Sequence, residues 1–124
     1  MQMRIEGGVN LALKIPKAHY PATLAFYREA LGLELTRENS AEVNESWSCQ
    51  FGPNRLWLDR VDGYSQTDVW MELKTDDLDA AMVQLEQFGV AARDELEPLP
   101  AGVRGHWISS PAGTVHLIHE EKRP

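Results

Sequence analysis

Polar and aromatic side chains alternate with aliphatic ones in several short segments of the chain. Trp57 and Asp59 alternate with leucines, and Trp70 and Glu72 alternate with valine, methionine and leucine. An indole can stack on a planar ring or hold a cation over its face, and a carboxylate accepts hydrogen bonds from an amine. This combination favours a small organic ligand, aromatic or cationic. The residues predicted to contact it are Asn10, Lys14, Trp57, Asp59, Trp70, Glu72, Lys74 and His116, with Arg55 on the same face.

The same side chains also have structural interpretations. The tryptophans can fill the interior as packing residues. Lys14 can form an internal ion pair with Asp59. Lys74, at the matching position later in the chain, can do the same with Glu72. His116 can be a hydrogen-bonded interior histidine rather than an acid, base or ligand. In that case the protein is an interaction module whose face is filled by its own side chains.

The sequence gives little evidence for other kinds of reactive group. Cys49 is the single cysteine, which excludes an intrachain disulfide and a paired-cysteine zinc site and predicts a small buried hydrophobe. His19, His106 and His119 have no partner at catalytic spacing, and the chain contains no Gly-rich phosphate loop or nucleophile elbow. The sequence therefore identifies no catalytic residue.

The elements that position these side chains occur twice in the same order: strand, helix, strand, strand, strand. Both predicted helices end at a glycine, in Leu31-Gly32 and in Phe88-Gly89. One helix covers only one face of a four-stranded sheet, so each unit leaves a concave face open. The predicted strands cover 9–15, 33–37, 47–51 and 55–61, then 69–75, 90–93, 103–109 and 114–119, with helices between Pro21 and Gly32 and from Asp76 or Asp77 to Gly89.

Length and composition indicate one globular domain, 1–124, with a module at about 8–61, a linker at 62–68 and a second module at about 69–121. The chain has 124 residues, of which 43% are hydrophobic and 25% charged. The net charge of −7 disfavours nucleic acid and anionic membrane as partners, because both require a basic face. With no secretory signal and no apolar stretch of roughly 20 residues, a cytoplasmic protein is expected.

Two motifs resemble those of the vicinal oxygen chelate superfamily, which contains glyoxalase I, extradiol dioxygenases and the bleomycin resistance proteins. The first is Thr23-Leu24-Ala25-Phe26-Tyr27 with Ala30-Leu31-Gly32-Leu33, and the second is Ser110-Pro111-Ala112-Gly113. The resemblance covers nearly the whole chain. It implies an α+β fold in which two βαβββ modules form a mixed-sheet half-barrel pair, commonly assembled as a homodimer.

The resemblance also implies four metal positions, which fall on Asn10, Trp57, Trp70 and His116. Tryptophan has no lone pair for a metal, and asparagine is a weak neutral ligand. His116 matches the fourth metal position only if the turn before its strand is one residue shorter than usual. Its placement therefore depends on the register of that strand. A metal site rebuilt from Asp59, Glu72 and His116 in a shifted arrangement is the remaining possibility.

In lacking these metal ligands, the chain resembles the metal-free bleomycin resistance branch. Proteins of that branch sequester a bulky cationic drug in an aromatic-lined cleft. The resemblance thus implies a protein that binds a small organic ligand without a cofactor or metal chemistry. The alternative is a lyase, isomerase or dioxygenase of the glyoxalase type that uses a divalent metal, with Glu72 or His116 as ligand or general base.

Overall fold

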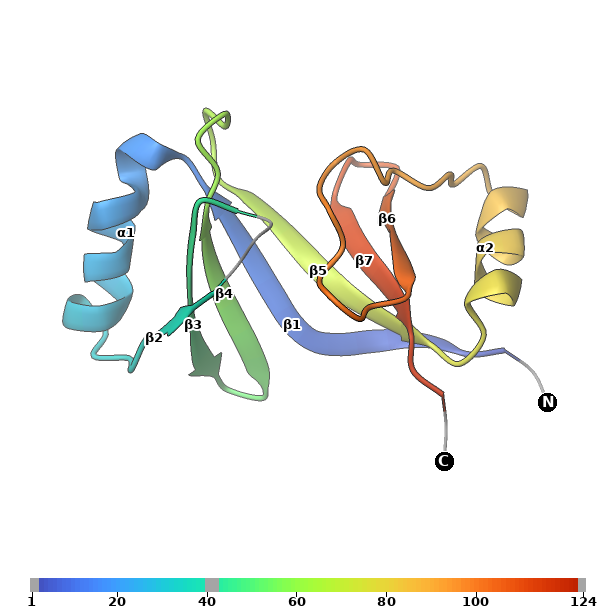
Figure 1. Cartoon of the computed structure of the whole chain (residues 1–124), viewed down its shortest axis with the longest axis horizontal. Coiled ribbons are helices and arrows are strands. Elements are labelled where there is room, and N and C mark those ends of the chain that lie inside the picture. The colour runs from blue at the N-terminus through green and yellow to red at the C-terminus, as the bar shows by residue number, and fades with distance from the viewer. Residues whose placement is uncertain (1–2, 40–42, 123–124) are drawn as a thin grey trace. The chain divides into compact units, whose positions relative to one another are not determined.

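The computed structural model describes residues 3–39 and 43–122, which form two compact units (Figure 1). The central unit is Val9–Trp70, and the terminal unit combines the residues up to Gly8 with those from Met71 onward. Residues 40–42, between the predicted strands at 33–37 and 47–51, lie outside the described residues. The elements are β1 (Ile5–Ile15), η1 (Lys17–His19), α1 (Tyr20–Ala25), η2 (Phe26–Ala30), β2 (Thr36–Glu38), β3 (Glu45–Phe51), β4 (Asn54–Arg60), β5 (Asp68–Thr75), α2 (Leu78–Gln87), β6 (Gly105–Ser109) and β7 (Val115–Glu120).

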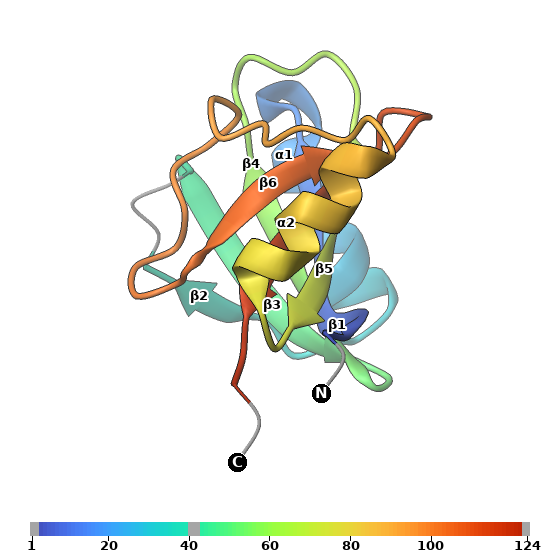
Figure 2. The ribbon, with the colours of Figure 1, turned by 90° about the vertical axis from the view of Figure 1, so that its right-hand side faces the viewer.

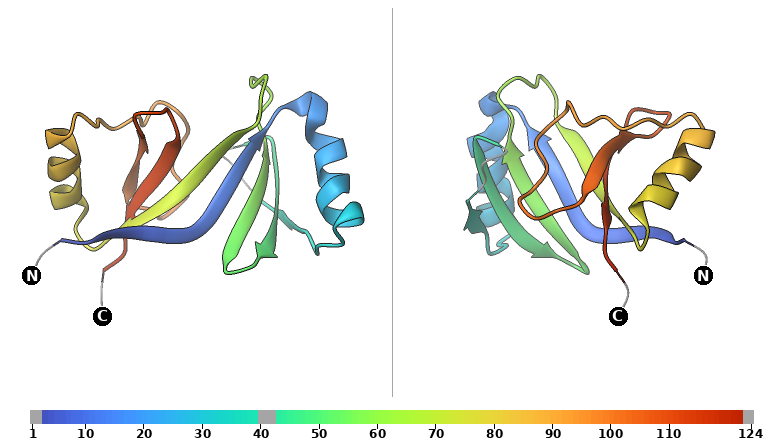
Figure 3. Two further views of the ribbon diagram at one scale, coloured as in Figure 1. Left: turned by 180° about the vertical axis from the view of Figure 1, so that it is seen from behind. Right: turned by 45° about the vertical axis from the view of Figure 1, so that its right-hand side comes forward.

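The central unit is a sheet in the order β2-β3-β4-β1, with α1 and η2 on one face (Figure 3). β1 runs parallel to β4, and the pairs β2–β3 and β3–β4 are antiparallel. Apolar residues at every second position of β1 and β4 face the helix, as the alternation predicts. The buried core cluster between the two layers consists of Ile15, Tyr20, Leu24, Cys49, Leu56 and Leu58.

The helix of the central unit changes its geometry halfway. α1 has Pro21 in its first turn, where the missing N–H costs no hydrogen bond, and it continues as the π-helix η2. Gly32 follows with a φ of 72°, a conformation that side chains other than glycine rarely adopt. The predicted end of this helix is therefore confirmed.

The terminal unit has a strand order of β5-β7-β6, with α2 packed across the strands (Figure 2). β5 and β7 are parallel, and β6 and β7 are antiparallel. Asp77 is the N-cap of α2, because its side chain accepts a hydrogen bond from the Ala80 N–H, and Gly89 follows the helix with a φ of 81°. The buried core cluster beneath α2 consists of Leu78, Ala81, Ile108 and Ile118.

The predicted strand at 90–93 is wrong: only an isolated bridge between Ala92 and Ile108 forms there. Next to this bridge, the main-chain N–H of Trp107 donates to the side-chain oxygen Asp94 Oδ1 at 3.0 Å, and not to a main-chain oxygen of a neighbouring strand. Seven strands result within the described residues, in the hydrogen-bonded order β2-β3-β4-β1-β5-β7-β6, instead of the eight predicted. The mixed sheet with two helical layers is the α+β fold that the sequence predicts.

Candidate functional site

The face of the central sheet opposite α1 carries four of the predicted ligand residues. In the parallel register of β1 and β4, Lys14 is the partner of Asp59 and Ala12 is the partner of Trp57. Asn10 lies on the same side of β1 as Lys14, four residues earlier. The alternation of β1 and β4 thus gathers Asn10, Lys14, Trp57 and Asp59 on one surface.

Asn10 and Trp57 are hydrogen-bonded to each other. The Trp57 Nε1–H donates to Asn10 Oδ1 at 2.8 Å, and both side chains are half-buried. The amide oxygen of Asn10 therefore has a donor within the protein. The indole plane of Trp57 is oriented by this bond.

Lys14 forms a buried ion pair on the same face, near the ends of β1 and β4. Its Nζ lies 2.8 Å from Asp59 Oδ2, and the other carboxylate oxygen accepts a hydrogen bond from Ser46 Oγ at 2.6 Å. The ammonium also lies over the Trp70 ring, 4.3 Å from its centroid. Trp70 is buried, and its Nε1–H donates to Asp68 at 3.0 Å. The interpretation of Lys14 and Asp59 as an internal ion pair is confirmed.

A second polar cluster lies nearer the edge of this sheet. The Arg55 guanidinium donates to Ser48 Oγ at 2.8 Å and lies 3.7 Å from the Glu38 carboxylate. Ser48 in turn donates to Glu38 Oε2. Ser46, Ser48 and Glu38 are not among the predicted residues, although the alternation of Ser46 and Ser48 with Trp47 and Cys49 indicates that the two serines share a face.

The terminal unit holds the other predicted residues and a pair that the sequence did not reveal. His119 Nε2 lies 2.9 Å from Glu72 Oε2, and both side chains are largely buried. Lys74 Nζ lies 3.6 Å from Glu121. The predicted pair of Lys74 with Glu72 is therefore wrong, and so is the statement that His119 has no partner. β5 and β7 are neighbours only in the folded sheet, so no local pattern could reveal the pair.

His106 also has an acidic partner in the fold. Its Nδ1 lies 2.7 Å from Asp94 Oδ2 on the surface of the terminal unit. The prediction that His106 has no partner is therefore wrong.

His116 lies on the α2 side of the terminal sheet. Its register partner on β6 is Ile108, which belongs to the core beneath α2, as does Ile118 two residues further along β7. Glu72 lies on the other face, because Leu73 packs against that core. Glu72 and His116 therefore cannot join in one metal site with Asp59. The short turn before β7 sets this register, and it places Leu117 on the face of Glu72.

The implied metal positions do not offer the donors that a divalent metal requires. Asn10 accepts from Trp57, the indoles of Trp57 and Trp70 have no lone pair for a metal, and His116 points to the opposite face of its unit. Among residues 3–39 and 43–122, no group of three or more His, Cys, Asp or Glu side chains could hold a metal ion. The residues present do not fit the group that the superfamily implies.

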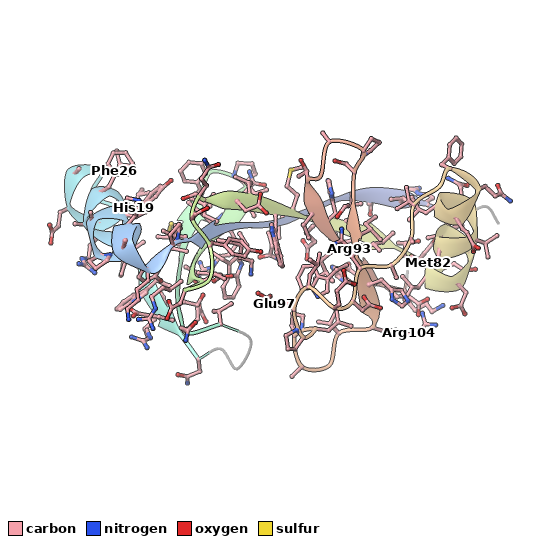
Figure 4. All side chains as sticks on the ribbon, turned by 90° about the horizontal axis from the view of Figure 1, so that it is seen from above. His19, Phe26, Met82, Arg93, Glu97 and Arg104 are labelled. Atoms are coloured by element: carbon pink, nitrogen blue, oxygen red, sulfur yellow. The ribbon has the colours of Figure 1, made fainter. Side chains whose placement is uncertain are left out.

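A long loop packs against the face of β6 that points away from α2. Trp107 is buried beneath it, and its Nε1–H donates to the main-chain oxygen of Glu97 at 2.8 Å. Figure 4 labels Glu97 on this loop. In the terminal unit, part of the face opposite the helix is thus filled by the protein itself.

A pocket of about 360 Å³ lies on the helix side of the central unit. His19 and Phe26, which project from the helical segment in Figure 4, both contribute to it. No sequence pattern predicts this pocket. Its lining consists of Leu13, Ile15, His19, Ala22, Thr23, Phe26, Tyr27 and Thr67.

Two buried groups of the central unit have pKa values shifted by desolvation. Cys49 is buried, which confirms the prediction of a small buried residue, and this burial raises the pKa of its thiol. Burial, together with the negative charges of Glu45 and Asp59, raises the pKa of the Tyr20 phenol well above its ordinary value. Tyr20 donates its hydroxyl hydrogen to the main-chain oxygen of Leu58.

Comparison with known proteins assigns the chain to a family. Residues 12–118 match the model of the glyoxalase-like domain, so the protein belongs to the glyoxalase-like domain family. No curated protein matches the chain. Within the described residues, no helix has the length and apolar character needed to cross a membrane.

Several solved structures have a similar fold. A Mn(II)-bound glyoxalase from Novosphingobium aromaticivorans is 20% identical, with a TM-score of 0.64 over 99% of this chain and 43% of that chain. Methylmalonyl-CoA epimerase from Mycobacterium tuberculosis is 16% identical, with a TM-score of 0.61 over 95% and 89%. A superfamily member from Vibrio splendidus 12B01 is 12% identical, with a TM-score of 0.62 over 97% and 100%. These likenesses confirm the predicted fold.

Proposed function

We propose that this protein binds a small aromatic organic molecule on the polar face of its central unit, without metal chemistry. The observation that carries the proposal is the hydrogen bond between Trp57 and Asn10. Asn10 and Trp57 occupy two positions at which the superfamily implies metal ligands, and here their side chains are hydrogen-bonded to each other. The indole of Trp57 is half-buried, and its flat surface suits a planar organic ring.

Trp57, rather than Trp70, is the stacking surface in this proposal. Trp70 is only 3% exposed, and the Lys14 ammonium lies over its ring. Trp57 keeps part of its surface exposed. Polar groups next to it can orient a ligand, because the Arg55 guanidinium is 35% exposed and lies on the same face.

Titration of the protein with a panel of small aromatic compounds, followed by tryptophan emission and by calorimetry, tests this function. We expect at least one neutral aromatic compound to bind, and the Trp57→Ala variant to lose about tenfold in affinity because the stacking surface is removed. Trp47→Ala is the matched control. Trp47 packs against the α1-side core and donates to Glu45, so its removal should change affinity less than about twofold.

The proposal fails if no compound in a broad panel binds, or if Trp57→Ala binds as the wild type does. The first result favours an interaction module, since part of one face is already covered by the loop around Glu97.

The alternative function is metal-dependent lyase, isomerase or dioxygenase chemistry, as in the Mn(II)-bound glyoxalase. His119 and Glu72 favour it, because they bring a ring nitrogen and a carboxylate together at 2.9 Å. Metal analysis of protein purified without chelator separates the two functions. Near-stoichiometric transition metal, lost in Glu72→Gln, would support the alternative and contradict the proposal.

A further inference from the structure

The ammonium group of Lys14 lies next to a carboxylate and over the face of an aromatic ring. A carboxylate oxygen of Asp59 lies 2.8 Å from Nζ, and the face of the Trp70 ring lies 4.3 Å from it. A carboxylate combined with an aromatic face is the usual means by which proteins bind organic cations.

The groups around this ammonium are held in place by further bonds. Ser46 donates to the second oxygen of Asp59 at 2.6 Å, and Asp68 accepts from the indole N–H of Trp70 at 3.0 Å. Lys14 is 2% exposed, Asp59 7% and Trp70 3%. The carboxylate and the ring would therefore keep their orientation with a different cation between them.

We propose that Asp59 and Trp70 form an ammonium-binding site that Lys14 occupies from within the chain, and that this occupancy makes the face select against cationic ligands. The inference rests on the proposed function for the identity of the ligand face. A tethered ammonium is present at a high effective concentration, so a free cation must displace it and leave a buried lysine unpaired. The expected ligand of this face is accordingly neutral or anionic rather than cationic.

A variant that lacks the Lys14 ammonium tests the site directly. Lys14→Ala removes three methylene groups and the ammonium beyond Cβ, which together correspond to propylammonium. We expect propylammonium to raise the melting temperature of Lys14→Ala by about 5 °C at a tenfold excess over its dissociation constant. The wild type should show no shift, because its site is filled.

Two controls make the rescue specific. 1-Propanol has the same carbon chain without the charge and should not stabilise Lys14→Ala. The double variant Lys14→Ala with Asp59→Asn lacks the carboxylate and should lose the response to propylammonium. Equal responses to propanol and propylammonium, or an equal response of the wild type, would overturn the proposal.

The test also holds if Lys14→Ala does not fold on its own, since removing one partner of a buried pair is strongly destabilising. Propylammonium should then restore the native tryptophan emission during refolding, and failure to restore it overturns the proposal. The rescue needs no natural ligand, so its outcome is separate from that of the aromatic panel. In that panel, cationic analogues should bind Lys14→Ala more tightly than the wild type.

Discussion

Trp57 and Trp70 show how side chains of the same type acquire different roles. Both lie on strands, and each donates its indole N–H to a nearby acceptor. The acceptor of Trp70 lies two residues away on the same strand, whereas Asn10, the acceptor of Trp57, is 47 residues away. Burial separates them further, because Lys14 covers the ring of Trp70. Alternation in the sequence could predict the face of each residue but not its partner.

Tyr20 provides a prediction at the residue scale. Its hydroxyl donates to the main-chain oxygen of Leu58 at 2.5 Å inside the core. Tyr20→Phe removes this buried hydrogen bond, and we expect the free energy of unfolding to fall by about 1–2 kcal/mol at neutral pH. Urea unfolding measures the change. The control is Tyr27→Phe, because Tyr27 is only partly buried and packs at the margin of the same core.

The pH dependence follows from the raised pKa of the Tyr20 phenol. Below pH 10.0, the ordinary pKa of a tyrosine, the phenol is neutral in both states, and its contribution to stability is complete. Above that pH the unfolded state ionises first, so the contribution falls as pH rises. The stability gap between wild type and Tyr20→Phe should narrow from about pH 10 upward. A gap that widens there would contradict the assignment.

Two adjacent glycines in β1 provide a prediction at the scale of elements. A Cβ on Gly8 would overlap the side chain of Glu72, whereas a Cβ on Gly7 would have no atom within 4 Å. Gly8→Ala must therefore displace Glu72 from His119. We expect it to lower the free energy of unfolding by about 1–3 kcal/mol, with Gly7→Ala as the control of similar strand propensity.

A double-mutant cycle tests the cause of this effect. In the background Glu72→Ala, the side chain that Gly8 accommodates is absent, so Gly8→Ala should cost much less than it does in the wild type. Equal costs in both backgrounds would show that Glu72 is not what requires the glycine.

The ends of α2 show which contacts between elements were predictable. Asp77 as the N-cap follows from residue type and position, and the structure confirms it. Glu120, at the end of β7, also accepts from the Leu78 N–H at 2.9 Å, and this bond is the main reason that its pKa is lowered. No local rule reveals the second contact, because 42 residues separate the two groups.

At the scale of the whole molecule, we expect the protein to be a homodimer. In the central unit, the registers place Val9 and Phe51 in one row on the α1 side, next to Asn54, and these two apolar side chains are 49% and 43% exposed. Phe26 and Leu31 on the helical side are also about half exposed. Exposed apolar surface of this kind is typical of an interface.

Sedimentation or light scattering measures the assembly. The expected mass is twice the 14.0 kDa of one chain. Phe51→Lys should reduce the dimer fraction, because it places a charge in the apolar row, whereas Phe88→Lys serves as a control on the separate terminal unit. A monomer at all concentrations would contradict the expectation.

The sequence alone was sufficient for the features that depend on neighbouring residues. Alternation along 9–15, 55–61 and 69–75 predicts which side chains share a face, and glycine at positions 32 and 89 predicts where the helices end. The repeated order of elements indicates two matching modules, and the resemblance of two motifs implied the fold and the family. The comparisons confirm the fold and the glyoxalase-like family.

Only the tertiary structure decided which of these side chains meet. Lys14 and Asp59 are 45 residues apart, and Glu72 and His119 are 47 apart, so both pairs depend on which strands become neighbours and in which register. A shift of one residue reverses the face of a whole strand, and the turn before β7 places His116 toward α2 for this reason. Chemical type and periodicity depend only on neighbouring residues, whereas the partners of a side chain depend on how the strands pair in the folded sheet.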